Sequence, residues 1–276
     1  MYYIYAVAYL LVGASAGSFL NVVAWRIPRG ESIVSPGSRC TSCGSPIKWY
    51  DNVPVLSWFL LGGKCRNCRA HFSIRYAMVE LAAGLIFLIM FLHFGPGIES
   101  IKYCAFSALL LCATLTDLDH WLILDSVSIG GTVLGLAFSL LPNGGSFIPA
   151  LLAAAGGFLL FLIIRLASIQ VLRRKPGYTV APKGHEEEAD EFQGGMGWGD
   201  VKLAAMIGAF LGPSSTAVAF FAAFLTGAVI GTIVMIAGRS RRIPVPFGPF
   251  MALGAIISVF AGEGIWAFYL RVGLNL

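Results

Sequence analysis

Charged residues are scarce in this chain of 276 residues: they make up 12% of the sequence, whereas hydrophobic residues make up 57%. A soluble domain carries roughly 25% charged residues, about twice this share. The scarcity is uneven, because residues 26–75 contain eight Lys and Arg while long stretches elsewhere contain almost none. These stretches are continuously apolar rather than alternating, which excludes strands of a porin-type barrel. The sequence therefore predicts an all-α polytopic membrane protein.

The apolar residues fall into eight segments, with boundaries near 3–25, 76–94, 101–117, 127–142, 147–170, 201–212, 214–238 and 247–270. Two of them, 127–142 and 201–212, are shorter than the roughly 20 residues that cross a bilayer as a helix. We expect about eight transmembrane helices, joined by a polar loop at 26–75 and a second long, Pro- and Gly-containing loop at 171–199.

Basic residues concentrate in alternate connections between these segments. Lys and Arg occur in 26–75, in 173–183 and in 239–242, but not in the loops near 95–100, 142–146 and 212–214. The excess of Lys and Arg in cytoplasmic loops of membrane proteins places the N-terminus outside and all three basic connections in the cytoplasm. Because topology accounts for the net charge of +5, no nucleic-acid partner is indicated.

Acidic residues are also few, and two of them lie at the ends of apolar segments. Asp117 ends the third segment, with Asp119 two residues nearer the loop, and Asp200 opens the sixth segment directly after Gly197 and Gly199. Ionised carboxylates near hydrocarbon are costly and usually mark a functional site. Two carboxylates on separate segments suggest a pair that folding assembles, as in an aspartic protease.

If Asp117 and Asp200 meet, like charge prevents both from ionising, so the pair shares one proton. The ionised carboxyl then takes a proton from a water that attacks a peptide carbonyl, while the protonated one polarises that carbonyl. The residues alone favour Asp117 over Asp119 only by depth in the apolar segment. Asp125, just before an apolar run, fits a helix N-cap. The four histidines are scattered, so no Ser/His or Cys/His arrangement competes.

The glycine string before Asp200 superficially resembles a phosphate-binding loop. It follows no predicted strand, and the aspartate at its end would repel phosphate, so we reject a dinucleotide site. Glu80, inside the second apolar segment, is a further acid in an apolar setting. It either pairs with Arg75 or serves a second site.

Four cysteines in the basic loop form two pairs, Cys40-x-x-Cys43 and Cys65-x-x-Cys68, with 21 residues between them. This spacing is close to that of a four-cysteine zinc ribbon, in which two tight turns supply a tetrahedral set of thiolates. Disulfides or a redox pair are the alternatives. A cytoplasmic location disfavours stable disulfides, and no βαβ pattern surrounds either pair. We expect a small cytoplasmic zinc-ribbon-like domain with a structural zinc.

Several motifs together resemble those of the bacterial prepilin peptidase (type IV leader peptidase, prepilin N-methyltransferase) family over nearly the whole chain. These motifs are Gly17–Val22, Ser35–Pro36, the two cysteine pairs with Asp51–Pro54 between them, Arg75–Leu81, Asp117–His120 with Asp125, and Gly197–Lys202. The combination is specific, whereas the glycine–aspartate motif alone also occurs in presenilin-type proteases. One departure is Leu124, where the family usually has proline.

The resemblance implies a membrane aspartic endopeptidase of the bacterial inner membrane that removes short basic leaders from prepilins and pseudopilins at the cytoplasmic face. It assigns catalysis to Asp117 and Asp200 and support of the catalytic loop to Gly197, Gly199 and Lys202. It also implies N-methylation of the new N-terminus with S-adenosylmethionine, by residues that the sequence does not identify. The implied division is a methyltransferase-associated region at 1–95 and a six-helix peptidase core at 96–276.

The alternative from another functional class is a membrane transporter or scaffold. It would be stabilised by zinc and would use the acids as a proton relay. Its acids should line a path across the membrane, whereas these cluster at the cytoplasmic ends of segments. Peptide cleavage distinguishes the two hypotheses.

Overall fold

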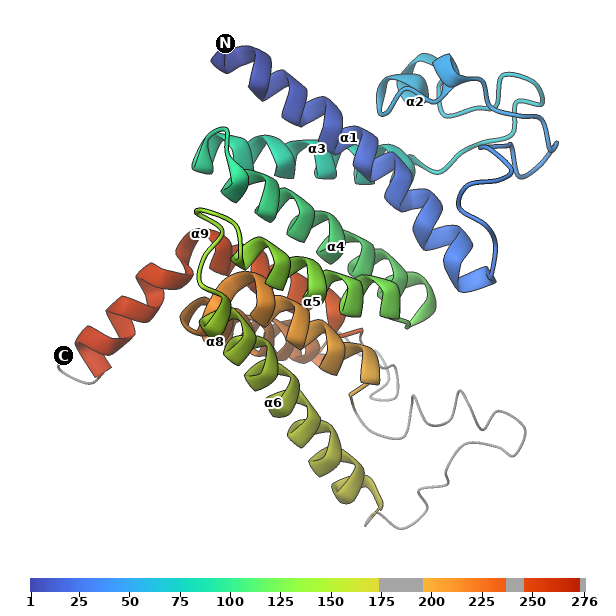
Figure 1. Cartoon of the computed structure of the whole chain (residues 1–276). Coiled ribbons are helices and arrows are strands. Elements are labelled where there is room, and N and C mark those ends of the chain that lie inside the picture. Colours follow the sequence, from blue (N-terminus) through green and yellow to red (C-terminus); the bar gives the residue numbers. More distant parts are fainter. Residues whose placement is uncertain (174–195, 237–245, 274–276) are drawn as a thin grey trace. The chain divides into compact units, whose positions relative to one another are not determined.

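The computed structural model describes residues 1–173, 196–236 and 246–273, and these residues are mostly helical. The long helices are α1 (Tyr2–Arg26), α3 (Ile74–Phe94), α4 (Ile98–His120), α5 (Asp125–Ser139), α6 (Phe147–Arg173), α8 (Trp198–Ile236) and α9 (Gly248–Gly273) (Figure 1). The connection between α1 and α3 contains α2 (Leu56–Leu60), two 3₁₀ turns (Ile27–Arg29 and Trp49–Asp51) and two isolated β-bridges. Most of the expected loop 171–199 and the basic residues 239–242 lie outside the described residues.

In their described residues, the eight apolar segments of the sequence coincide largely with helices. Segment 201–212 and the described part of segment 214–238 form the single helix α8, which is interrupted at Gly212, where φ is 73° and ψ is 177°. Pro213 follows this kink, and its missing N–H suits a break in the helical hydrogen bonding. Among the described helices, six are long and apolar enough to cross a membrane, whereas α5 has only 15 residues. The prediction of an all-helical, multi-pass membrane protein is confirmed.

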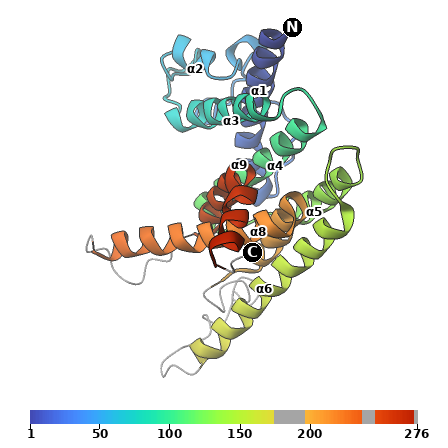
Figure 2. The same ribbon diagram turned by 90° about the vertical axis from the view of Figure 1, so that its left-hand side faces the viewer.

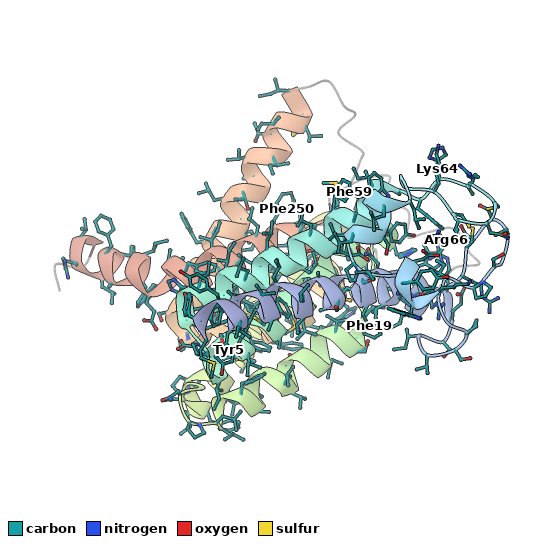
Figure 3. The ribbon with its side chains drawn as sticks, turned by 90° about the horizontal axis from the view of Figure 1, so that it is seen from above. Tyr5, Phe19, Phe59, Lys64, Arg66 and Phe250 are labelled. Carbon is teal, nitrogen blue, oxygen red and sulfur yellow. The ribbon has the colours of Figure 1, made fainter. Side chains whose placement is uncertain are left out.

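The chain divides into two compact units, Met1–Thr116 and Asp117–Leu276. In the first unit α1 and α3 lie side by side, as Figure 3 shows with Tyr5 and Phe19 on α1. A Cβ added at Gly13 would lie 2.7 Å from the Ala83 carbonyl, and one at Gly17 would lie 2.8 Å from the Cα of residue 80. The two glycines, four residues apart on α1, therefore allow the helix backbones to approach closely.

In the second unit α8 packs against α5, α6 and α9 (Figure 2). The side chains of Leu203, Met206, Ile207 and Phe210, in the part of α8 before the kink, are fully buried. The last turn of α4, from Asp117 onward, also belongs to this unit. The unit therefore brings the end of α4 together with the beginnings of α8 and α9.

Candidate active site and metal centre

Asp117 lies in the last turn of α4 and is only 6% exposed. Its Oδ2 accepts a hydrogen bond of 2.8 Å from the backbone N–H of Gly248, the first residue of α9. The first N–H groups of a helix have no partner within the helix, and they carry its partial positive charge. The beginning of α9 therefore supplies a donor and a favourable dipole to this carboxylate.

Asp200 lies in the first turn of α8 and is 9% exposed. Its Oδ2 accepts a hydrogen bond of 3.1 Å from the backbone N–H of Gly197, three residues earlier. This is the geometry by which an acidic side chain in the first turn caps its own helix. The bond orients the carboxylate, and Asp200 is close enough to Asp117 for the two groups to repel each other electrostatically. Folding thus brings together the two acids that the sequence singled out.

The residues around Asp200 have different roles. A Cβ at Gly199 would lie 2.8 Å from the Cβ of Ile123, so only glycine fits there without displacement. Gly197 has no such crowding, and its observed contribution is the N–H that it donates to Asp200. Lys202, one turn into α8, forms an ion pair of 2.6 Å with Asp125 at the beginning of α5.

The expectation that Asp125 is a helix N-cap is wrong. The cap position of α5 is Leu124, Asp125 is already helical, and no side chain caps this helix. The carboxylate of Asp125 is instead engaged by Lys202 from α8. Asp119 is exposed, unlike Asp117 two residues before it.

Arg165, which sequence reasoning missed, lies in α6 and is 3% exposed. Its Nη1 donates a hydrogen bond of 2.6 Å to the carbonyl oxygen of Met196, and its guanidinium carbon lies 4.9 Å from the centre of the Trp198 ring. It also interacts electrostatically with Asp200. A buried cation inside a membrane-type helix is costly and usually functional. In the sequence, Arg165 is the only charged residue of the apolar run 147–170, and this lone charge could have identified it as a functional residue.

The four cysteines of the first unit form one cluster, with all four sulfurs within 4.8 Å of one another and the Sγ atoms of Cys40 and Cys68 3.7 Å apart. Sulfurs bound tetrahedrally at about 2.3 Å to zinc lie about 3.8 Å apart, so the donor set suits this ion. All four thiols are free rather than joined in disulfides.

The two cysteine pairs sit in matching turns. The N–H of Gly44 bonds to the Cys40 carbonyl at 2.9 Å, and the N–H of Arg69 bonds to the Cys65 carbonyl at 3.0 Å. Gly44 and Arg69 both have positive φ, of 71° and 61°, which turns the chain back after each pair. Each turn aims two sulfurs at one point, as the spacing predicted.

Hydrogen bonds from the Ser45 side chain and then its backbone lower the pKa of the Cys43 thiol to about 6. A hydrogen bond from the Ala70 backbone acts in the same direction at Cys68, but loss of hydration and the other three thiols outweigh it and raise the pKa of this exposed thiol to about 11. The crowding of four sulfurs therefore resists full ionisation until a cation compensates their charge.

An ion pair borders this cluster. Arg66 donates to both carboxylate oxygens of Asp51, with Nη2 2.6 Å from Oδ1 and Nε 2.9 Å from Oδ2. These hydrogen bonds, with the charge of Arg66, lower the pKa of the Asp51 carboxyl. Figure 3 shows Arg66 and Lys64 on the loop beyond the C-terminal end of α1. The two-point contact joins the segment before α2 to the second cysteine turn.

Comparison with known proteins gives two family matches. Residues 11–94 match the bacterial peptidase A24 N-terminal domain, and residues 104–232 match the type IV leader peptidase family. No solved structure matches the chain significantly.

Similar curated proteins carry the name prepilin leader peptidase/N-methyltransferase. The protein from Myxococcus xanthus is 35% identical, over 86% of this chain and 65% of its own length. The protein from Bacillus subtilis is 31% identical, over 96% of this chain and 98% of its own length. The protein from Aeromonas salmonicida is 29% identical, over 92% of this chain and 90% of its own length.

Proposed function

The chain belongs to the type IV leader peptidase family, and from this premise we propose that Asp117 and Asp200 are the catalytic pair of a membrane-embedded aspartic endopeptidase. The observation that carries the proposal is the meeting of two buried carboxylates from the ends of two membrane-type helices, close enough to interact. Each accepts a backbone N–H, which fixes its direction while leaving its other oxygen for substrate or water.

The chemistry follows from the repulsion between the two groups. Two neighbouring carboxyls in a water-poor site share one proton, because ionising both is costly. The ionised member takes a proton from water, and the resulting nucleophile attacks the scissile carbonyl. The protonated member donates a hydrogen bond to that carbonyl oxygen and stabilises its developing charge. Gly197 and Gly199 support the loop that holds Asp200, and Lys202 ties the beginning of α8 to α5.

The substrates follow from the family and the names of the relatives. The enzyme removes the short basic leader of prepilins and related pseudopilins, and then methylates the new N-terminus with S-adenosylmethionine. We assign methylation to the region 1–95, and cleavage to 96–276. Zinc in the cysteine cluster holds the loop of the first region in shape.

The location follows from charge. Basic residues in 26–75 and 239–242 favour a cytoplasmic position for these loops, and this supports a catalytic pair near the cytoplasmic face of the bacterial inner membrane. Labelling of cysteines introduced in the loop 26–75, in intact and in permeabilised cells, tests this orientation. Labelling in intact cells by a reagent that does not cross the membrane would contradict it.

The cleavage experiment uses purified protein in liposomes with a prepilin substrate and mass spectrometry of the products. Asp117→Asn and Asp200→Asn each remove one titratable group at nearly constant volume, so we expect cleavage to fall by several orders of magnitude. Asp119→Asn is the matched control, because it removes an exposed carboxylate two residues from Asp117. A folded Asp200→Asn protein that cleaves at nearly the wild-type rate would refute the assignment.

A further inference from the structure

The first unit contains a cavity of about 1440 Å³ between α1, the beginning of α3 and the cysteine-bearing loop. Its lining includes Asn21 of α1, Tyr76 of α3, and both Cys40 and Cys65. Sites for small molecules usually enclose about 300–1,000 Å³. This cavity is therefore large enough for two ligands at once, such as a methyl donor and the end of a peptide.

Glu80 lines this cavity and is the only acidic residue of α3. Its Oε2 accepts a hydrogen bond of 2.7 Å from the backbone N–H of Val55. It forms no ion pair with any residue in the described part of the chain, so the expected pairing with Arg75 is not found there. A carboxylate without a cation partner in a membrane-type helix is a costly feature that points to a function.

The partner of Glu80 is held in a strained conformation. Val55 has φ 64° and ψ −55°, which is rare for a β-branched residue. The N–H of Leu56 bonds to the carbonyl of Pro54 at 2.6 Å, so Val55 is the centre of a tight three-residue turn of the unfavourable hand. Such strain persists where the surrounding structure enforces it, and it gathers at functional sites. Here it aims the Val55 N–H at Glu80 and fixes the carboxylate.

The other acids that line the cavity differ from Glu80. Asp51 is engaged by the two-point contact with Arg66. Glu31 is exposed in the loop after α1. Glu80 is thus the oriented and partly buried carboxylate of this cavity that no described cation neutralises. The chemistry that it suits is recognition of a cation, such as an ammonium group.

We propose that Glu80 binds the α-amino group that is exposed by leader cleavage and accepts its proton before methyl transfer. This assignment rests on the methyltransferase activity proposed above. The docked ammonium gives one proton to the carboxylate and becomes a neutral amine. The nitrogen lone pair then attacks the methyl carbon of a sulfonium donor; the carbon–sulfur bond breaks and its electron pair stays on sulfur as a thioether. The product is an N-methylammonium, and the Glu80 proton passes to water.

The test compares cleavage, methylation and donor binding in one preparation of Glu80→Gln. Glutamine can still accept from the Val55 N–H, so the strained turn is kept while the charge and the base are removed. We expect methylation of a supplied, already cleaved substrate to fall by roughly 100-fold or more, the usual contribution of a general base. Leader cleavage and binding of radiolabelled S-adenosylmethionine should stay within twofold of wild type.

Glu263→Gln is the matched control, since it neutralises an exposed acid of α9 that does not line the cavity, and it should methylate normally. Methylation by Glu80→Gln within threefold of wild type overturns the assignment. A loss of donor binding that matches the loss of methylation also overturns it, because Glu80 would then hold the donor rather than the amine.

Wild-type protein that cleaves but never methylates would overturn the methyltransferase activity itself, and this assignment with it. If Glu80→Gln fails to fold, Glu80→Asp keeps the charge but withdraws it by one methylene. Displacing a reacting group by about this distance lowers the reaction rate on the order of 10²-fold. Undiminished methylation by Glu80→Asp would therefore contradict the proposal.

Discussion

The backbone N–H of Gly248 donates a hydrogen bond of 2.8 Å to Oδ2 of Asp117, and a Cβ at position 248 would lie 2.6 Å from the same oxygen. The first residue of α9 and the last turn of α4 therefore meet with no space for a side chain. Because the donor is a backbone N–H of a helix, it holds the carboxylate more firmly than a donor on a flexible side chain would.

We expect Gly248→Ala to abolish most cleavage while leaving the protein folded. The added methyl group must push the Asp117 carboxylate or the start of α9 away, and a displacement of about 1 Å at a reacting group can cost on the order of 10²-fold in rate. The measurement is kcat for leader cleavage together with the thermal midpoint of unfolding.

Gly231→Ala serves as the control for this substitution. It also adds one methyl group at a helical glycine, but no atom lies within 4 Å of the new Cβ. It should leave cleavage unchanged and, since alanine favours helix, should not lower stability. If Gly248→Ala and Gly231→Ala lowered cleavage equally, crowding at Asp117 would not be the cause of the loss.

Arg165→Gln should lower kcat for cleavage on the order of 100-fold, with a smaller change in KM. The substitution removes the donor to the Met196 carbonyl and the cation over Trp198, both of which hold the chain just before Asp200. Arg165→Lys should recover only part of the activity, because an ammonium cannot both donate along the same direction and stack on the ring.

Arg271→Gln, at the exposed end of α9, provides the control for loss of a positive charge and should cleave normally. Full activity in Arg165→Gln, with an unchanged thermal midpoint, would leave Arg165 without a role in placing Asp200.

The ion pair between Lys202 and Asp125 should contribute little to cleavage, although Lys202 lies two residues from Asp200. The two side chains are 28% and 62% exposed, and exposed ion pairs are worth about 0–1 kcal/mol. We expect Lys202→Met and Asp125→Asn each to reduce cleavage by less than about fivefold. A double-mutant cycle measures the coupling directly, and a coupling above about 2 kcal/mol would contradict this estimate.

The sequence predicts part of this site for clear physical reasons. Asp117 and Asp200 stand out because carboxylates are rare at the ends of apolar segments, and the cysteine spacing alone predicts the cluster of four sulfurs. These signals are local: each depends on one residue type in a short stretch of chain.

Other parts of the site depend on contacts between distant segments, which no local pattern records. Gly248 carries no polar side chain, so nothing in the sequence connects its N–H to Asp117. Asp125 looked like a helix cap because its local context fits one, but a lysine 77 residues away engages its carboxylate instead. Arg165 had a visible signal, a lone charge in an apolar run, but its partner carbonyl was not predictable.

Purified protein should contain about one zinc per chain, because the four sulfurs are spaced for a single tetrahedral ion. Cys43→Ser should lower the zinc content and increase proteolysis of the loop between α1 and α3, because a small polar loop with few buried apolar side chains depends on its metal for shape. A strong chelator, or acid that protonates the thiolates, should have the same effect on wild-type protein.

Cys104→Ser is the control, because Cys104 is a buried thiol of α4 outside the cluster, and this variant should keep its zinc. Retention of a full equivalent of zinc after all four cluster cysteines are replaced by serine would rule out this site.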